Sequence, residues 1–139
     1  MLEKIMNSPN LNYLPRGLEA STLRHEIISH NLANVNTPKF KRSSVDFEDL
    51  LAKEIAPKEG DYPMALTHDK HIRPGYPRKR AEATVRLEND DTMRVDGNNV
   101  DIDMEMANLA KNQLYYNALA TQLRGFVRGI KEVITSGQS

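Results

Sequence analysis

His68 and His71 are separated by two residues, a spacing at which two imidazoles can bind one metal ion, and Asp69 could add a carboxylate ligand. Lys70 lies between them, however, and its ammonium group would repel a cation. The other histidines lie far away in the N-terminal quarter, and the chain has no cysteine. Ordinary hydrogen bonding in a loop explains this cluster better than a metal site, so we expect no bound metal.

Asp101, Asp103 and Glu105 form a carboxylate cluster that could perform acid–base chemistry. The same residues begin the strongest predicted helix of the chain, where negative side chains complement the positive end of the helix dipole. The sequence contains no Gly-x-Ser-x-Gly elbow, phosphate-binding loop or dinucleotide fingerprint. We therefore expect neither catalysis nor a cofactor nor a small-molecule substrate.

Arg78, Lys79 and Arg80 form a short basic run that could contact nucleic acid. The whole chain is neutral, however, with 19 basic and 19 acidic side chains, and the run lacks the stacking aromatics of a strand-binding surface. Eight acidic residues follow between Glu82 and Glu105, an arrangement suited to head-to-tail contact between copies. A plain solvated surface and a small helical nucleic-acid-binding protein remain the alternatives.

The composition favours an elongated protein or one that is buried against partners. The mean hydropathy of −0.61 and the 6% aromatic content are low for a compact globule, although 139 residues suit a single domain over residues 1–139. Without cysteine there can be no disulfide or thiolate metal site. No apolar run approaches the roughly 18 residues of a membrane span. Polar residues interrupt residues 1–15, so we expect no cleaved signal peptide.

Apolar or large side chains near the C-terminus alternate in steps of four and three residues, the heptad pattern of a helix that packs along one seam. Acidic residues crowd the start of this stretch and basic residues crowd its end, which complements the helix dipole. The pattern predicts a helix over about residues 102–134, within a C-terminal segment at 101–135. Its seam consists of Ile102, Met106, Leu109, Tyr116, Ala120, Leu123, Val127, Ile130 and Ile134, with Gln113 in the one polar slot.

A second, weaker seam predicts a helix over about residues 11–35. Pro15 suits the first turn, where a missing N–H costs no hydrogen bond. Pro38 stops the helix, because the residue before a proline is pushed out of the helical region. The seam consists of Leu14, Leu18, Ser21, His25, Ile28, Leu32 and Val35.

Neither helix can leave such a stripe exposed, so we expect the two to pair as a coiled-coil-like hairpin. Two helices enclose only a thin core, and further apolar side chains lie off both seams, so we expect other subunits to cover part of this surface. Gly125 and Gly129 each cost a helix about 1 kcal/mol relative to alanine. They are candidates for the close approach of another backbone, and a frayed helix end is the alternative.

The middle of the chain, residues 36–100, holds five of the seven prolines and lacks the long heptad pattern of the two ends. Residues 45–55 are predicted as a short helix with one apolar face. Alternating side chains predict short strands at 83–87 and 93–95, separated by a turn. We predict that residues 56–80 form an extended loop.

Two stretches of the sequence resemble the flagellar basal-body rod family. The first, residues 29–41, is similar to the family signature in which two asparagines flank a small apolar pair at the end of the first helix and Thr-Pro-Gly-Tyr-Lys follows. Asparagine can satisfy the last carbonyls of a helix. Lys39 replaces the usual glycine, so the turn after Pro38 need not take a positive φ. The matching residues are Asn31, Leu32, Ala33, Asn34, Thr37, Pro38 and Phe40.

The second stretch, residues 96–103, continues through Glu105, Met106 and Ala107 and is similar to the opening of the C-terminal helix in a proximal rod subunit. The resemblance spans essentially the whole chain. Both motifs together are quite specific, whereas either alone is shared with other rod and hook proteins.

The resemblance implies a mainly α structural subunit whose terminal helices pair and self-assemble into a helical tube across the periplasm. Such a tube transmits torque and encloses the export channel. The implied partners are copies of the chain, other rod proteins, the membrane-embedded basal-body ring and the type III export apparatus, which exports subunits without a cleaved signal. Another axial rod subunit of the same family, such as the C type, is the alternative within it.

Overall fold

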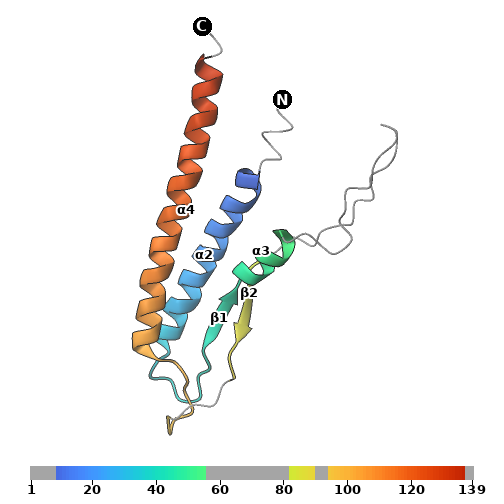
Figure 1. Ribbon diagram of the computed structural model, residues 1–139. Helices are drawn as coiled ribbons and strands as arrows, with labels where there is room; N and C mark the ends of the chain where they lie inside the picture. Colours follow the sequence, from blue (N-terminus) through green and yellow to red (C-terminus); the bar gives the residue numbers. More distant parts are fainter. Residues whose placement is uncertain (1–8, 56–81, 90–93, 137–139) are drawn as a thin grey trace, which may run out of the picture.

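The computed structural model describes residues 9–55, 82–89 and 94–136, which are coloured in Figure 1. Two long helices, α2 (Pro9–Ala33) and α4 (Ile102–Ser136), run antiparallel side by side. The strands β1 (Ser43–Asp46) and β2 (Thr84–Leu87) and the short helix α3 (Glu48–Ile55) lie beside α2. The long terminal helices, the short helix and the small antiparallel sheet confirm the expected mainly α fold.

Helix α2 begins and ends two residues earlier than predicted. Pro15 therefore lies inside the helix rather than in its first turn, where its ring removes the backbone hydrogen bond to Leu11. At the other end the Asn34 N–H is shared between the carbonyls of His30 at 3.2 Å and Asn31 at 3.1 Å, and the Val35 N–H donates to the Leu32 carbonyl at 3.3 Å, so the last turn tightens to the 3₁₀ pattern. The chain has thus left the helix before it reaches Pro38.

The turn after Pro38 contradicts the expectation that it need not take a positive φ. Lys39 adopts a φ of 60°, the left-handed conformation that glycine takes most easily. Its N–H donates to the carbonyl of Asp96 at 2.9 Å. Gly97 passes so near that a Cβ added there would lie 3.8 Å from the Lys39 Cα. The contact between these two loops requires the backbone to reverse at residue 39, whichever side chain occupies it.

Replacing Lys39 with glycine is expected to stabilise the fold by up to about 1 kcal/mol. A side chain in the left-handed region costs about 1–2 kcal/mol, of which glycine gives back about 0.5–1 in backbone entropy. Urea unfolding followed by circular dichroism would show a higher midpoint with an unchanged slope. Asn36→Gly, in the same loop but without a positive φ, is the control and should not raise the midpoint. A lower midpoint for Lys39→Gly would contradict the strain argument.

Strands β1 and β2 pair antiparallel, with Ser43 opposite Leu87 and Asp46 opposite Thr84. The strand predicted at 83–87 therefore exists, but its partner is β1 and not residues 93–95. Val95 lies fully exposed in a turn, and Met93 falls outside the described residues. The pairing of β2 with β1 could not be predicted from the local sequence, because the two strands lie about 40 residues apart in the chain.

Strand β1 occupies the start of the helix predicted at 45–55, so α3 begins only at Glu48. Val45 and Phe47 are buried, with 8% and 2% exposure. Their spacing of two places both side chains on one face of a strand but not of a helix. The Leu51 N–H then donates to the Phe47 carbonyl at 2.8 Å as the helix begins.

The histidine-containing stretch at 67–71 and the basic run at 78–80 lie outside the described residues, as does the loop predicted at 56–80. Within the described ranges, no group of three or more His, Cys, Asp or Glu side chains is placed to hold a metal ion. None of the helices that the structure describes combines the length and the apolar character needed to cross a bilayer.

Candidate assembly interface

Helices α2 and α4 approach closely at Gly17. A Cβ added to Gly17 would lie 3.0 Å from Leu119 Cδ1, tighter than nine in ten real Cβ contacts. The glycine therefore lets the Leu119 side chain pack directly on the backbone of α2. Neither periodicity nor composition points to Gly17, because nothing in the sequence around it shows what packs there.

Ser21 and Asn112 join the middle of the two helices through a reciprocal pair of hydrogen bonds. The Ser21 hydroxyl donates to Asn112 Oδ1, and Asn112 Nδ2 donates to the Ser21 carbonyl, each at 2.9 Å. Both residues are buried, with 1% and 4% exposure. Each polar side chain thus finds its partner in the other, although the two are 91 residues apart in the sequence.

Glu105 lies one heptad before Asn112 and has no exposed surface. Its carboxylate accepts hydrogen bonds from Asn31 Nδ2 at 3.0 Å and from Arg42 Nε at 2.6 Å. Asn31, equally buried, also donates to the Ser43 carbonyl at 2.8 Å and accepts from the Ser43 N–H at 3.0 Å. Glu105 therefore does more than complement the helix dipole, since it joins α4 to α2 and to the start of β1.

Arg42 pairs with two carboxylates, Glu105 and Glu88, and we call Asn31, Arg42, Glu88 and Glu105 the Glu105 cluster. Burial disfavours the charge of Arg42, but its hydrogen bonds to both carboxylates outweigh this and raise its pKa. Burial likewise opposes the charge of Glu88, yet hydrogen bonds from neighbouring side chains, including Arg42, lower its pKa. The cluster thus holds its opposite charges together where α2, α4 and both strands meet.

A third buried amide, that of Asn98, closes the loop that follows α2. Its Nδ2 lies 2.9 Å from the carbonyl of Asn34, 3.0 Å from that of Val35 and 2.9 Å from that of Thr37. Its Oδ1 accepts the Val100 N–H at 2.7 Å. Asn98 therefore donates to carbonyls of the loop that follows α2, from a position 61–64 residues away in the sequence.

The residues that match the family signature gather at this end of the hairpin. Asn31 belongs to the Glu105 cluster, and Asn34 Oδ1 accepts a hydrogen bond from the Thr37 hydroxyl at 3.2 Å. The Phe40 ring packs against the His30 ring, with 5.5 Å between centroids. The remaining signature residues are half-buried or exposed, namely Leu32, Ala33 and Pro38.

Most residues of the predicted α2 seam face inward, whereas some residues of the α4 seam are half-buried and the others are exposed. On α2, Leu14, Ser21 and Ile28 are buried and Leu18 and Leu32 are half-buried, whereas His25, which was predicted on the seam, is exposed. Val35 is buried in the turn that follows α2. On α4, contact with α2 passes through positions 105, 112 and 119, which are seven apart, rather than through 106, 113 and 120. The half-buried seam residues of α4 are Leu109, Ala120, Leu123 and Ile130.

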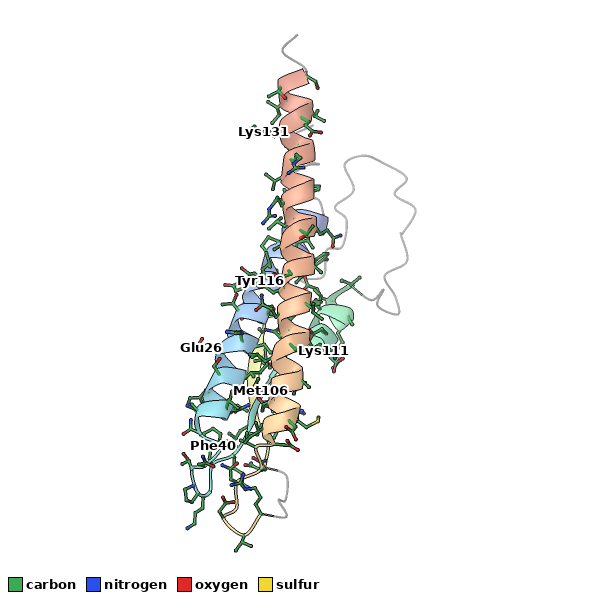
Figure 2. The ribbon with its side chains drawn as sticks, turned by 90° about the vertical axis from the view of Figure 1, so that its left-hand side faces the viewer. Glu26, Phe40, Met106, Lys111, Tyr116 and Lys131 are labelled. Atoms are coloured by element: carbon green, nitrogen blue, oxygen red, sulfur yellow. The ribbon has the colours of Figure 1, made fainter. Side chains whose placement is uncertain are left out.

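The rest of the α4 seam is exposed to between 39% and 62%, and we call Ile102, Met106, Tyr116, Val127 and Ile134 the outer stripe. Figure 2 looks onto this side of α4, with Met106 and Tyr116 labelled. Gly125 and Gly129 each lie two residues from Val127, roughly 160° around the helix at 3.6 residues per turn, and therefore on the opposite face of α4. A Cβ added to either would meet nothing within 4 Å. The outer stripe and the glycines are therefore uncovered within one chain.

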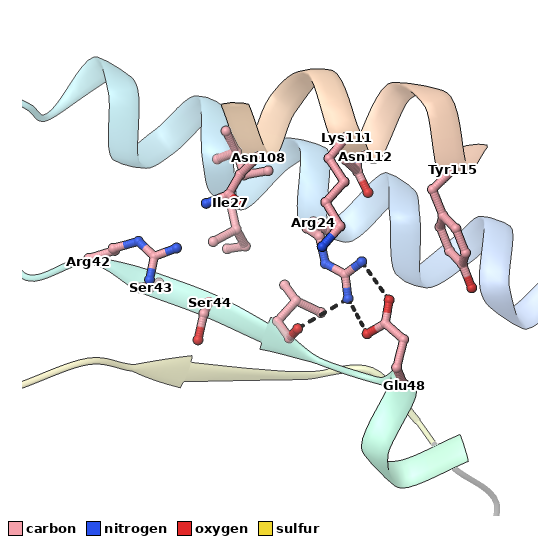
Figure 3. Close-up of a pocket in the computed structure, with 12 residues that line it drawn as sticks. Arg24, Ile27, Arg42, Ser43, Ser44, Glu48, Asn108, Lys111, Asn112 and Tyr115 are labelled. Atoms are coloured by element: carbon pink, nitrogen blue, oxygen red, sulfur yellow. Dashed lines mark hydrogen bonds and ion pairs between the residues drawn. The ribbon is translucent and has the colours of Figure 1, made fainter. Parts of the chain in front are cut away.

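A groove of about 620 Å³ opens between α2, α4 and β1 (Figure 3). The Arg24 guanidinium pairs with Glu48 through two hydrogen bonds, at 2.7 and 2.5 Å. Burial opposes the charge of Glu48, but the hydrogen bond from Arg24 helps to lower its pKa. Arg16 and Glu54 form a second such pair, so α3 is attached to α2 at both of its ends. Both arginines therefore join α3 to α2.

The most informative polar residues, Glu105, Asn112 and Asn98, were not predicted as interface residues. The heptad pattern was assigned from apolar side chains. It therefore includes Met106 and Leu109 and places Gln113 in its one polar slot, but it leaves out Glu105 and Asn112. The available signal was the seven-residue spacing of Glu105 and Asn112, which continues through Leu119 and Phe126.

Comparison with known proteins finds no family model that matches the chain. Flagellar basal body rod protein FlgB of Bacillus subtilis is 30% identical to it over 131 residues, which cover 94% of the chain and 97% of that protein. FlgB of Proteus mirabilis is 33% identical over 142 residues, covering 99% of the chain and all of the relative. FlgB of Escherichia coli is 28% identical over 141 residues, with 99% of each covered. The similarity therefore extends over the whole helical hairpin and its middle segment.

Proposed function

The chain belongs to the family of the flagellar basal body rod protein FlgB, and we propose that it assembles with copies of itself and with other rod proteins into a helical tube. It is accordingly a flagellar basal-body rod subunit. In the proposed tube the terminal helices of neighbouring subunits pack together, and the tube transmits torque and encloses the export channel. The chain reaches its place by flagellar type III export without a cleaved signal and lies in the periplasm-spanning rod, close to the membrane-embedded ring.

The outer stripe of α4 carries this proposal. Its side chains are large and mostly apolar, they follow one helix for nearly its whole length, and each is at least 39% exposed. An extended apolar surface of this kind marks a protein–protein contact rather than a surface adapted to water. Neighbouring subunits that cover this stripe would supply the core that two helices alone provide only thinly.

Gly125 and Gly129 fit the same proposal as points of close approach. Each lowers the intrinsic stability of α4, yet no side chain of the described chain packs on them. A neighbouring backbone that lies against these positions would use the missing side chains. We propose that the glycines adjoin another subunit in the rod.

Val127→Asp and Gly129→Leu test the proposal, because both positions are exposed in one chain. We expect each purified variant to keep its helical circular dichroism and each to be at least tenfold depleted from isolated basal bodies. Aspartate would place a charge in the apolar contact, which costs several kcal/mol. Leucine would be too large for the close contact at Gly129, and such overpacking typically costs about 1–3 kcal/mol in every subunit.

Val127→Ile and Gly129→Ala are the matched controls, since they preserve the apolar surface and nearly preserve the volume. Both should enter basal bodies and support swimming. Complete rods that contain Val127→Asp at the normal amount would contradict the role of the outer stripe. Normal incorporation of Gly129→Leu alone would remove only the close contact at the glycines.

A further inference from the structure

Asn112 is the last polar contact described along the helix pair in the direction of the α4 C-terminus. At the opposite end, the Glu105 cluster and Asn98 already hold α4 against the loops. Beyond Asn112 the inward positions of α4 carry Leu119, Leu123 and Phe126, which pack through shape alone. An apolar residue at 112 would extend this packing without interruption.

We propose that the Ser21–Asn112 pair restricts α4 to a single register on α2 of its own chain and excludes pairing with a second α4. The proposal concerns the folding of one chain and does not depend on the proposed function. A polar residue at one inward heptad position is known to select register and partner at some cost in stability. The reciprocal bonds between Ser21 and Asn112 provide that selection in the middle of the hairpin.

The apolar positions alone would select the register weakly. Leu109, Leu123 and Ile130 on α4 and Leu14 and Ile28 on α2 are apolar and lie seven or fourteen residues apart on their helices. A slip of one heptad therefore keeps apolar side chains together at these positions, and it is opposed by the two buried polar contacts, Ser21–Asn112 and Asn31–Glu105.

In a slipped register Asn112 would lie opposite Leu14 or Ile28, both of which are buried. Its amide would lose both hydrogen bonds in an environment that offers no replacement, which makes the slipped register unfavourable. A parallel pair of α4 helices would separate Asn112 from Ser21, and it would bring Glu105 beside its own copy, where two buried carboxylates repel each other.

The test replaces the polar pair with apolar residues in the full chain, as Ser21→Ala with Asn112→Leu. Because the natural sequence has no cysteine, Glu19→Cys and Lys131→Cys provide specific spin-label sites on exposed faces of α2 and α4. Pulsed dipolar spectroscopy then measures the distance between them. One heptad of slip displaces the helices by roughly 10 Å, at about 1.5 Å per residue. A chain labelled only at residue 131 reports pairing between two copies of α4.

We expect the polar chain to give one distance and no signal between copies. The apolar variant should keep its helicity and melting temperature, yet show a second, displaced distance or a signal between copies. Asn117→Leu makes the same amide-to-leucine change at an exposed position of α4 and should behave like the unaltered chain.

A folded apolar variant with the single original distance and no association would overturn the proposal. If that variant fails to fold, Ser21→Ala with Asn112→Ala repeats the test with less added volume. Failure of both to fold would show that the pair supplies stability rather than selectivity, and it would equally overturn the proposal. If Asn117→Leu broadened the measured distance distribution equally, the added leucine would be the cause, and this result would count against the role of the Ser21–Asn112 pair.

Discussion

Glu105→Ala is expected to lower the free energy of unfolding by about 3–5 kcal/mol, the usual cost of removing one partner from a buried ion pair. Arg42 would lose one of its two carboxylates, and the buried amide of Asn31 would lose an acceptor. No water can replace them at a carboxylate that has no exposed surface. Denaturant unfolding followed by circular dichroism measures the loss directly.

Glu132→Ala is the control, because Glu132 is exposed on the same helix and its removal should change stability by no more than about 0.5 kcal/mol. Glu105→Gln keeps the size of the side chain and its acceptor for Asn31 but removes the charge that faces Arg42. The loss of stability for Glu105→Gln should therefore lie between the losses for Glu132→Ala and Glu105→Ala. A loss below about 1 kcal/mol for Glu105→Ala would mean that the cluster relaxes or that water enters, and it would contradict the burial argument.

Asn98→Ala is expected to cost roughly 2–4 kcal/mol, because it deletes several buried hydrogen bonds worth about 0.5–1.5 kcal/mol each. The carbonyls of Asn34, Val35 and Thr37 would lose a shared donor, and the Val100 N–H would lose its acceptor. The loop after α2 and the entry to α4 should loosen together. Amide exchange would therefore accelerate at both places, in addition to the fall in the unfolding midpoint.

Asn98→Asp separates geometry from hydrogen bonding, since it preserves the shape but removes the donors. The new carboxylate would face carbonyl oxygens, so this variant should be at least as unstable as Asn98→Ala. Asn36→Ala, an exposed asparagine in the same loop, should be close to neutral. If Asn98→Asp were as stable as the unaltered chain, the amide could not be the group that holds the loop.

The sequence by itself determined the two long helices, and α4 most closely, because the information for a helix is local. The alternation of apolar positions and the acidic start at Asp101 predicted its first residue correctly. Asp101 Oδ1 indeed accepts hydrogen bonds from the N–H groups of Asp103 and Met104. The signature at 29–41 and the stretch at 96–103 also led to the right family from residue types alone.

Tertiary structure alone decided which polar side chains enter the helix interface. Glu105 and Asn112 are ordinary solvated residues in any local reading, and they become inward residues only because Asn31, Arg42 and Ser21 stand opposite them. The same holds for β1, which takes residues of a predicted helix into pairing with β2, and for Lys39, whose positive φ follows from its contact with Asp96. A buried polar group is stable only when its partner is in place. Such partners lie tens of residues away in this chain, so the seven-residue spacing of Glu105 and Asn112 cannot show which side chains stand opposite them.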